Sequence, residues 1–503
     1  MKKICLISVT EKKGLIELLN NLDIKAFQIV ATSGTFKYLK DNNINSIEIN
    51  DFTGFKEILN GRVKTLHPKI FAGILAKPNN KNHLDDLKKL KFDCIELVIC
   101  NLYNFNKTVK QETDEEIILE NIDIGGVSLI RASAKNYKNV IILSSPNQYV
   151  DYIKKHKDNN LNLEYRKNLA KSAFKLTYQY DMKIFNYFNN IDLDTNILSL
   201  ENQTKLDYGE NPHQSASLIK TDYDKYNIIK VLGNKISYNN ILDINAALNL
   251  VENFDDKIFC AVFKHTIPCG SAIGITVCEA FQKADSCDPV SAYGGIIVTN
   301  QRVTSDLANL IIKKFFEIVI APEFDEDALK ILSQKKKLRA VKYKVKNKNY
   351  FYEIKSDYTG ILIQQKDYFN NKEFEILKNI DKKNIELINN IQLGIIVSRS
   401  IKSNAIVLTN NNMTIGIGAG QPNRIDSVKI SIKNAKKFNF SLENSVLCSD
   451  GFFPFSDSIE FIKNFGIKTI VQPGGSIRDK EVIATCNQNN LKILLTGYRH
   501  FKH

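Results

Sequence analysis

The stretch Phe27-Gln28-Ile29-Val30-Ala31-Thr32-Ser33-Gly34-Thr35 shows how the first part of the chain is built. Residues 27–31 are mostly apolar and predict a strand, after which hydroxyl residues and a glycine lead into a helix over residues 36–42. Free backbone N–H groups at such a helix start favour anions, although the same residues also make an ordinary N-cap. A strand over residues 4–9 and a helix over residues 12–22 come before it. This order predicts an α/β sheet that binds ligands in the loops at one edge.

The net charge of +14 over 503 residues raises the question of nucleic-acid binding. Only nine of the 69 basic residues are arginine, and the lysines are spread along the chain among asparagine and isoleucine. A dispersed lysine excess does not form the concentrated basic surface that nucleic-acid recognition uses. We therefore expect no nucleic-acid partner, and each arginine within a glycine-rich or polar motif becomes more informative.

Hydrophobic patterning and cysteine spacing argue against a membrane protein, a secreted protein and a zinc-binding protein. No apolar run approaches the roughly 20 residues that span a bilayer, and residues 4–9 are typical of a first strand rather than a signal peptide. The nine cysteines include no Cys-x-x-Cys pair, so structural zinc is not expected. The sequence predicts a cytoplasmic protein with no membrane segment and no metal.

Three segments of the first half carry more polar chemistry than loops need. The last of them begins a helix at Gly125-Gly126 and places Arg131 and Lys135 four residues apart on one face. A capped surface helix with solvated cations is the alternative for that segment. The three segments are Asp51-Phe52-Thr53-Gly54-Phe55 with Gly61-Arg62-Val63-Lys64-Thr65-Leu66-His67-Pro68-Lys69, then Asn101-Leu102-Tyr103, and then Asn121-Ile122-Asp123-Ile124-Gly125-Gly126 with Arg131-Ala132-Ser133-Ala134-Lys135-Asn136.

In the second half, Lys264-His265 follows the apolar run 259–263 and precedes a Pro/Gly turn. A strand that ends in a cation and an imidazole can hold an acid/base pair at a pocket mouth, although a strand can also simply end in polar residues. The run Gly416-Ile417-Gly418-Ala419-Gly420 lacks the spacing of a nucleotide loop and predicts close backbone packing instead. Further polar motifs are Leu206-Asp207-Tyr208-Gly209, Lys402-Ser403-Asn404, Asp450-Gly451-Phe452-Phe453-Pro454-Phe455 and Tyr498-Arg499-His500-Phe501-Lys502-His503.

The motifs of the first half resemble, almost letter for letter, the cyclohydrolase part of the AICAR transformylase/IMP cyclohydrolase family. The resemblance implies a methylglyoxal-synthase-like α/β domain over residues 1–200 that closes the ring of formyl-AICAR (FAICAR) to give IMP. It implies Lys64, Tyr103, Asp123 and Lys135 as catalytic residues. The positions implied to hold the ribotide are Ser8, Lys12, Thr35, Arg62, Thr65, Gly125 and Gly126.

The second half, residues 201–503, resembles the transformylase part of the same family. The resemblance implies two cytidine-deaminase-like α/β subdomains without zinc, at about 201–360 and 361–503, and transfer of a formyl group from 10-formyltetrahydrofolate to AICAR. The resemblance further implies that this folate is a co-substrate, that no cofactor is bound tightly, and that the protein is a homodimer. Lys264, His265 and Asn404 are the implied catalytic residues. The implied substrate-binding residues are Tyr208, Arg499, His503, Asp450, Phe452, Pro454 and Phe455.

Both reactions suit these residue types. A weak nitrogen nucleophile must lose a proton as it attacks a formyl carbon, and a cation or phenol must stabilise the oxyanion that develops. Neutral His265 can act as the base for the transfer while Lys264 stabilises the oxyanion or protonates the departing folate nitrogen. The aromatic residues 452–455 suit a flat pterin ring, with core packing as the alternative.

Asp207 departs from the family pattern, which reads Leu-Arg-Tyr-Gly where this chain has Leu206-Asp207-Tyr208-Gly209. The resemblance implies that the family's arginine at this position binds the ribotide phosphate. A carboxylate in its place should therefore weaken ribotide binding, and Lys205 or Lys264 is expected to offset this loss in part. Two alternatives follow from the sequence. One is an enzyme with cyclohydrolase activity only, and the other is a basic anion- or nucleic-acid-binding protein without catalysis.

Overall fold

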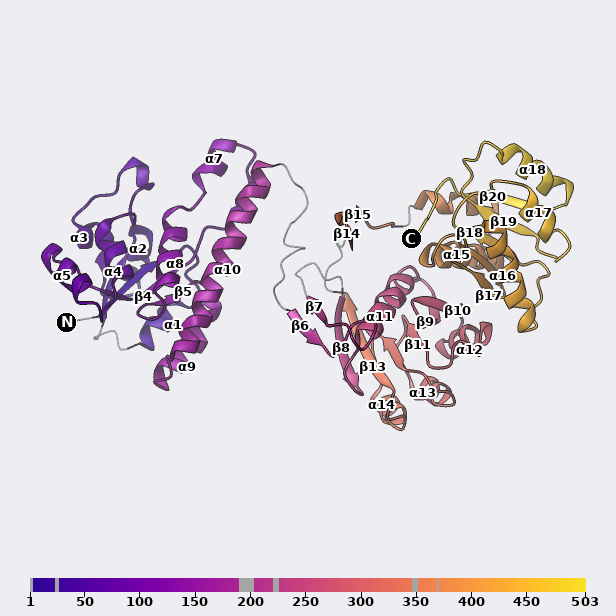
Figure 1. The fold of residues 1–503 in the computed structure, drawn as a ribbon, viewed down its shortest axis with the longest axis horizontal. Helices are drawn as coiled ribbons and strands as arrows, with labels where there is room; N and C mark the ends of the chain where they lie inside the picture. Colours follow the sequence, from indigo (N-terminus) through magenta and orange to yellow (C-terminus); the bar gives the residue numbers. More distant parts are fainter. Residues whose placement is uncertain (1–2, 23–26, 190–202, 220–225, 346–351, 369–370) are drawn as a thin grey trace. The chain divides into compact units, whose positions relative to one another are not determined.

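The computed structural model of the chain describes residues 3–22, 27–189, 203–219, 226–345, 352–368 and 371–503. The chain divides into two compact units, residues 1–199 and 200–503 (Figure 1). The polar stretch 190–202, where the sequence places the domain boundary, lies outside the described residues. Within the described residues no helix is long and apolar enough to cross a membrane.

The first unit is built on a parallel sheet with the strand order β3-β2-β1-β4-β5. Its central strands β1 and β4 are largely apolar and buried, as expected for a parallel sheet whose two faces are covered by helices. The strands are β1 (Lys3–Ser8), β2 (Phe27–Ala31), β3 (Ile47–Glu48), β4 (Ile95–Cys100) and β5 (Ile141–Leu143).

The helices of the first unit confirm the predicted pattern, with shifts at their starts. The long helix α10 (Leu163–Phe188) packs against α8 and β5 (Figure 1). The first helix begins only at Leu15, because Gly14 has a left-handed φ of 72°. The others are α1 (Leu15–Asn20), α2 (Ser33–Asp41), α3 (Ile49–Thr53), α4 (Pro68–Leu75), α5 (Lys81–Leu90), α6 (Phe105–Gln111), α7 (Glu115–Glu120), α8 (Gly125–Lys135) and α9 (Tyr149–Lys157).

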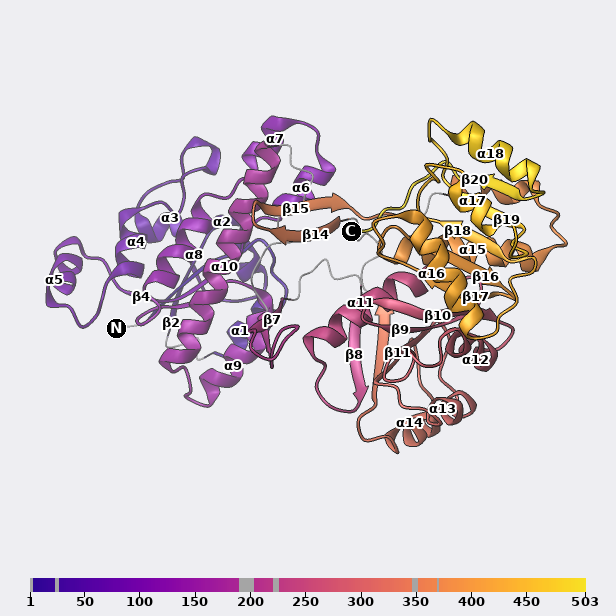
Figure 2. The same ribbon diagram turned by 45° about the vertical axis from the view of Figure 1, so that its right-hand side comes forward.

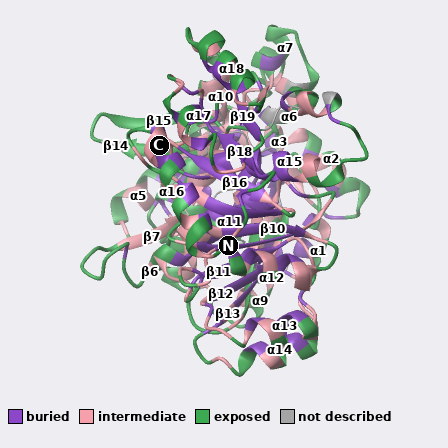
Figure 3. Cartoon of the chain, turned by 90° about the vertical axis from the view of Figure 1, so that its right-hand side faces the viewer, coloured by how far each residue is buried: buried purple, intermediate pink, exposed green. Residues whose placement is uncertain are grey.

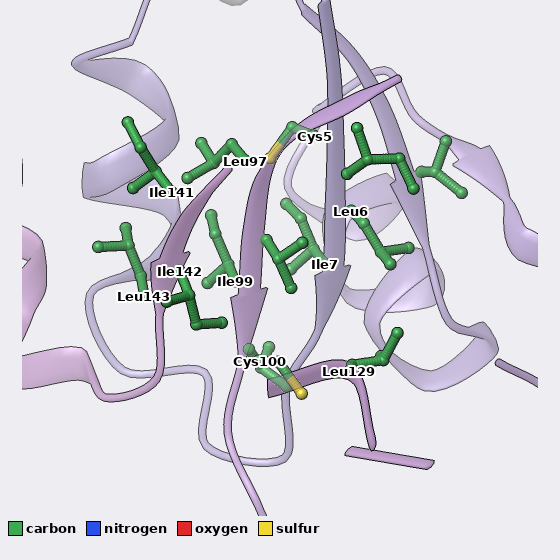
Figure 4. Close-up of a cluster of buried hydrophobic side chains, with 14 of the residues drawn as sticks. Cys5, Leu6, Ile7, Leu97, Ile99, Cys100, Leu129, Ile141, Ile142 and Leu143 are labelled. Atoms are coloured by element: carbon green, nitrogen blue, oxygen red, sulfur yellow. The ribbon is translucent and has the colours of Figure 1, made fainter. Parts of the chain in front are cut away.

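The core of the first unit lies where the central strands meet α8. Figure 4 shows Leu6 and Ile7 of β1 beside Ile99 of β4, with Leu129 of α8 near the ends of these strands, and all four are fully buried. Burying a side chain of this size contributes about 1.5–3 kcal/mol. The core therefore fixes the strand ends from which the polar loops leave.

The second unit is built on a mixed sheet that has 11 strands within the described residues, in the order β20-β19-β18-β16-β17-β10-β9-β11-β12-β13-β8. Its two halves meet at β10 and β17, which pair antiparallel at Ala272 and Met413. The strands are β8 (Tyr226–Leu232), β9 (Ile258–Lys264), β10 (Ile267–Gly274), β11 (Ile296–Thr299), β12 (Ile318–Ala321), β13 (Arg339–Val345), β16 (Ile406–Asn410), β17 (Met413–Gly418), β18 (Val446–Ser449), β19 (Thr469–Gln472) and β20 (Lys492–Leu495).

Helices pack on both faces of this sheet, and its central strands are buried (Figure 3), whereas the edge strands β8 and β20 are partly exposed. α11 and α15 pack on one face of the sheet, and the remaining helices pack on the other face. The helices are α11 (Tyr238–Val251), α12 (Val277–Cys287), α13 (Ser305–Ile311), α14 (Glu326–Ser333), α15 (Ile385–Ser400), α16 (Arg424–Lys437), α17 (Asp457–Ile462) and α18 (Asp479–Gln488).

The glycines of the run 416–420 explain how α16 lies so close to the sheet. A Cβ on Gly416 would lie 2.1 Å from the Ser431 carbonyl oxygen, and one on Gly418 would lie 2.0 Å from that of Ser427. Both serines belong to α16. The sequence prediction of close backbone packing is confirmed.

Two short hairpins complete the second unit. One is β6 (Gln203–Leu206) with β7 (Ala216–Ile219), and the other is β14 (Tyr352–Asp357) with β15 (Gly360–Gln365). The hairpin β14–β15 forms a sheet of its own, separate from the 11-stranded sheet (Figure 2). Its strand β15 is exposed along its whole length, including Ile361, Leu362 and Ile363.

Candidate active sites

The polar residues of the first unit gather at the carboxyl edge of its parallel sheet. Ser8 ends β1, and Thr32 follows β2 and donates hydrogen bonds to Ser8 Oγ and Thr35 Oγ1, both at 3.4 Å. The buried Thr35 hydroxyl also accepts from the Val9 backbone N–H at 3.2 Å. Lys12 lies over the ring of Tyr38 on α2, 5.6 Å from its centroid. Hydroxyls, backbone N–H groups at the start of α2 and one cation thus form a site suited to an anion.

A second cluster forms where the loop around Thr65 meets the start of α8. Thr65 is buried, and a Cβ on Gly125 would lie 2.6 Å from its Oγ1. Asp123 Oδ1 accepts the Gly126 backbone N–H at 2.7 Å, and a Cβ on Gly126 would lie 2.5 Å from Asp123 Oδ2. Glycine at these two positions therefore allows the carboxylate and the threonine to approach the helix N-terminus.

Burial raises the pKa of Asp123, against the opposing effect of backbone hydrogen bonds from Gly126 and Tyr103. The Asp123 backbone N–H in turn donates to the Tyr180 hydroxyl of α10 at 2.7 Å. A carboxyl group whose pKa is raised, held beside a half-exposed Tyr103, is suited to proton transfer. The structure brings Thr65, Tyr103, Asp123, Gly125 and Gly126 together.

The basic residues expected at this site either pair with acidic side chains or lie at the far end of α8. Lys64 forms an ion pair with Glu57 at 3.5 Å, and Arg62 pairs with Glu120 of α7. Lys135 is the last residue of α8, so about 16 Å of helix separates it from the Asp123 end. It lines a groove of about 600 Å³ between α8 and α10 with Arg131. Within one chain the structure does not bring Lys135 to Asp123.

In the second unit, Lys264 ends β9 and the next two residues make the turn into β10. His265 and Thr266 have left-handed φ angles of 54° and 63°, which cost about 1–3 kcal/mol each for residues other than glycine. Asp243 of α11 holds this turn by accepting the Thr266 backbone N–H at 2.6 Å, and Lys264 Nζ donates to the Tyr293 carbonyl oxygen at 3.0 Å. The strained turn leaves His265 exposed.

Acidic and amide groups that the sequence analysis missed surround this turn. Burial raises the pKa of Asp243, opposed by the hydrogen bond from Thr266 and the nearby His265. Glu317, just before β12, accepts from the Asn240 amide at 3.1 Å and pairs with Arg339 at 3.2 Å. These residues are distant in sequence, and none stands in a motif that signals its role.

Asn404 belongs to another network, which precedes β16. Its amide donates to the carbonyl oxygens of Gln421 at 2.9 Å and Pro422 at 3.0 Å, and its Oδ1 accepts from Arg424 at 2.6 Å. Arg424 also pairs with Asp450, which is fully buried and accepts the Ala405 N–H at 3.1 Å. Asp450 thus supports the site from inside and is not accessible to a ligand.

The strand directions place these groups at one edge of the sheet. β9, β10, β17 and β16 are antiparallel to their neighbours in turn, so the end of β9 and the start of β16 face the same way. Lys264 and Asn404 therefore share an edge three strands apart, at about 14 Å. No hydrogen bond or ion pair among the described residues joins them directly.

The aromatic run 452–455 divides between core and surface. Phe453 is fully buried, and its N–H donates to Gln472 Oε1 at 2.7 Å. Phe452 and Pro454 are half-buried, whereas Phe455 is exposed, with the Arg478 guanidinium carbon 4.7 Å from its ring centroid. Three of the four residues remain accessible to a ligand.

The residues around 499–503 lie at the same edge, after β20. The guanidinium carbons of Arg499 and Arg424 lie 4.5 Å and 5.9 Å from the Phe501 ring centroid. Phe501 also contacts the His503 ring, at 5.9 Å between centroids. Arg499 and His503 are thus brought to the Asn404–Arg424 network. Tyr208 is exposed in the loop after β6, and this loop contacts Lys235 and also Asn239 in the first turn of α11.

Asp207 forms an ion pair with Lys235 at 3.4 Å, and both side chains are largely exposed. The loop 207–214 contacts Lys235 and Asn239, and the expected compensation of the Asp207 charge by Lys205 or Lys264 stays a prediction. An exposed pair of this kind contributes little free energy.

The fold and these clusters define a two-domain α/β protein with two separate candidate active sites. A family model described as AICARFT/IMPCHase bienzyme matches residues 133–434, and one described as MGS-like domain matches residues 14–128. The bifunctional purine biosynthesis protein PurH of Caldicellulosiruptor saccharolyticus is 44% identical, and that of Aquifex aeolicus is 40% identical. The first alignment covers 100% of both chains and the second 99% of both. The chain belongs to the AICARFT/IMPCHase bienzyme family.

Proposed function

We propose that the chain catalyses two consecutive steps that end in IMP: formyl transfer from 10-formyltetrahydrofolate to AICAR, and dehydrative ring closure of FAICAR. The observation that carries this proposal is the pair of separate acid/base clusters, one in each unit of a chain that matches bifunctional relatives along its whole length. The relatives favour this function over the cyclohydrolase-only and nucleic-acid-binding alternatives.

In the transformylase reaction the AICAR amine attacks the formyl carbon of the folate. His265, exposed at the strained turn, takes the amine proton, and Lys264 stabilises the oxyanion and then protonates the departing folate nitrogen. Asp243 holds the turn by accepting the Thr266 backbone N–H. Asn404, fixed by Arg424, assists from the same edge.

Ligand binding at this edge uses both accessible and buried residues. Tyr208, Arg499 and His503 are proposed to contact the ribotide. The partly exposed Phe452, Pro454 and Phe455 offer flat apolar surface for the pterin, and buried Asp450 orients Arg424 beside them.

In the cyclohydrolase reaction the carboxamide nitrogen of FAICAR attacks the formyl carbon, and water leaves. Asp123, whose pKa is raised by burial, takes the proton, while Tyr103 and Lys64 stabilise the oxyanion. The ribotide phosphate binds at Ser8, Lys12, Thr35 and the glycine start of α8, with Arg62 and Thr65 near the base. Lys135 is included on its motif alone, because in one chain it lies at the far end of α8.

We further propose a cytoplasmic homodimer. The family resemblance implies this state, and the exposed hairpin β14–β15 supports it. An isolated two-stranded hairpin is marginally stable in water, and Ile361, Leu362 and Ile363 would be covered by a second copy. Measuring the mass in solution for the wild type and for Leu362→Asp tests this, since the variant should shift toward monomer.

Separate assays of the two steps test the function. Wild-type protein should consume AICAR with 10-formyltetrahydrofolate, and it should also convert FAICAR to IMP without folate. Conversion of FAICAR alone would leave cyclohydrolase as the sole activity. Absence of both conversions would refute the proposal.

A further inference from the structure

A buried histidine near the transformylase edge makes two hydrogen bonds that neither reaction uses. His500 is 5% exposed, and its Nδ1 lies 2.8 Å from Asp367 Oδ2 while its Nε2 lies 2.7 Å from Glu373 Oε2. Glu373 is fully buried and Asp367 is half-exposed. The imidazole thus joins segment 499–503 to two carboxylates that come from the residues before α15.

The charge state follows from this geometry. Burial alone lowers the pKa of His500, but the two carboxylates outweigh it and raise the pKa to about 9. A ring that binds acceptors on both nitrogens must carry both protons, so His500 is an imidazolium at neutral pH. Two charge-assisted hydrogen bonds on one ring hold its orientation more firmly than neutral bonds would.

Segment 499–503 is also attached to the Asn404 network on its other side. The His500 backbone N–H donates to the Asp450 carbonyl oxygen at 2.9 Å. Ser403 and Lys502 exchange two hydrogen bonds, from the Ser403 N–H to the Lys502 carbonyl oxygen at 2.9 Å and from the Lys502 N–H to Ser403 Oγ at 3.1 Å. Ser403 precedes Asn404 directly. His500 is therefore the buried anchor between Arg499 on one side and His503 on the other.

We propose that His500 is a positioning residue of the transformylase site, which fixes Arg499 and His503 for the ribotide through its bonds to Asp367 and Glu373. This inference rests on the proposed function, since it assigns these two residues to AICAR. Arg399 and Lys502 are further cations of the region, and Arg399 donates to the Asp367 carbonyl oxygen at 3.0 Å. Lys502 Nζ donates to the Ser400 carbonyl oxygen at 2.7 Å.

The test compares His500→Gln with the wild type in both assays. Glutamine can donate to only one of the two carboxylates, so the KM for AICAR should rise at least about tenfold while kcat changes less than about threefold. FAICAR closure by the same molecules serves as an internal control and should be unchanged. His156→Gln in α9, a residue that belongs to neither cluster, is the matched variant and should change neither assay.

A second, milder variant controls for the possibility that His500→Gln misfolds. Asp367→Asn alters the half-exposed partner and should raise the KM for AICAR in the same direction by a smaller factor. An unchanged KM in both variants would overturn the inference, as would an equal loss of both activities, which a purely structural role predicts. If the wild type does not turn over AICAR, the proposed transformylase function is refuted. If the wild type does so and the variants keep its KM, only the role of His500 is refuted.

Discussion

Arg424 donates to Asn404 Oδ1 at 2.6 Å and also pairs with Asp450, so one guanidinium links a proposed catalytic amide to a fully buried carboxylate. The position of Asn404 therefore depends on a buried charge pair. Neither partner can change without affecting the edge where Lys264 also lies.

Replacing Asp450 by asparagine should both destabilise the second unit and impair formyl transfer. The substitution leaves the Arg424 charge buried without its partner, which costs about 3–5 kcal/mol. Chemical denaturation monitored in the second unit gives the change. Asp306→Asn, on the exposed first turn of α13, is the control and should stay within about 0.5 kcal/mol. Equal stability of both variants would contradict the role of Asp450.

Replacing Gly126 by alanine should remove cyclohydrolase activity and spare formyl transfer. The added Cβ would lie 2.5 Å from Asp123 Oδ2, so the carboxylate must leave the start of α8. We expect a fall of at least about 100-fold in FAICAR closure, the usual contribution of a positioned acid or base. Ser128→Ala on the same helix is the matched control. A fully active Gly126→Ala enzyme would exclude Asp123 from the chemistry.

Replacing Asp123 by asparagine should lower activity without lowering stability. Burial raises the pKa of Asp123 in the folded protein, so the carboxyl group favours folding only at pH values below its unfolded pKa. That contribution is lost as the pH rises through the folded pKa, and the ionised group then opposes folding. At pH 7 the variant should melt at an equal or higher temperature while FAICAR closure falls. A clear drop in melting temperature would show that Asp123 serves mainly the fold.

Raising the pH should weaken the second unit through His500. Its folded pKa, raised to about 9, lies above its ordinary value of 6.5, so its contribution is complete below about pH 6.5 and is lost as the pH rises through about 9. The loss amounts to about 2 kcal/mol after allowance for solvent screening at half-exposed Asp367. Denaturation of the wild type and His500→Gln between pH 6 and 10 checks this. Parallel curves for the two proteins would disprove the contribution.

The elements that could be predicted from the sequence are those with local causes. α10 spans residues 163–188 because its apolar residues recur at helical spacing and Asn162 caps it by accepting the Tyr165 N–H. The close contact of α16 with Gly416 and Gly418 followed from the glycines themselves. The start of α1 was missed because the left-handed Gly14 delays it.

The long-range contacts could not be predicted in the same way. Glu317 and Arg339 come to the edge of the sheet where Lys264 lies only through the order of its strands. In the same way, Phe453 enters the core while Phe455 stays exposed. The sequence of the aromatic run does not show which of its side chains face the core, because this depends on the path of the backbone. Lys135 stood in a motif with Asp123, but the length of α8 separates them.

The most direct test of two separate active sites on one chain is a mixing experiment with Lys264→Ala and Asp123→Asn. Each variant alone, given AICAR and 10-formyltetrahydrofolate, should fail to make IMP. The first should still close FAICAR, and the second should accumulate it. Mixing the two proteins should restore IMP formation, because FAICAR made by one variant can be closed by the other. If either variant loses both steps, or if the mixture makes no IMP, the two sites do not act as independent catalysts.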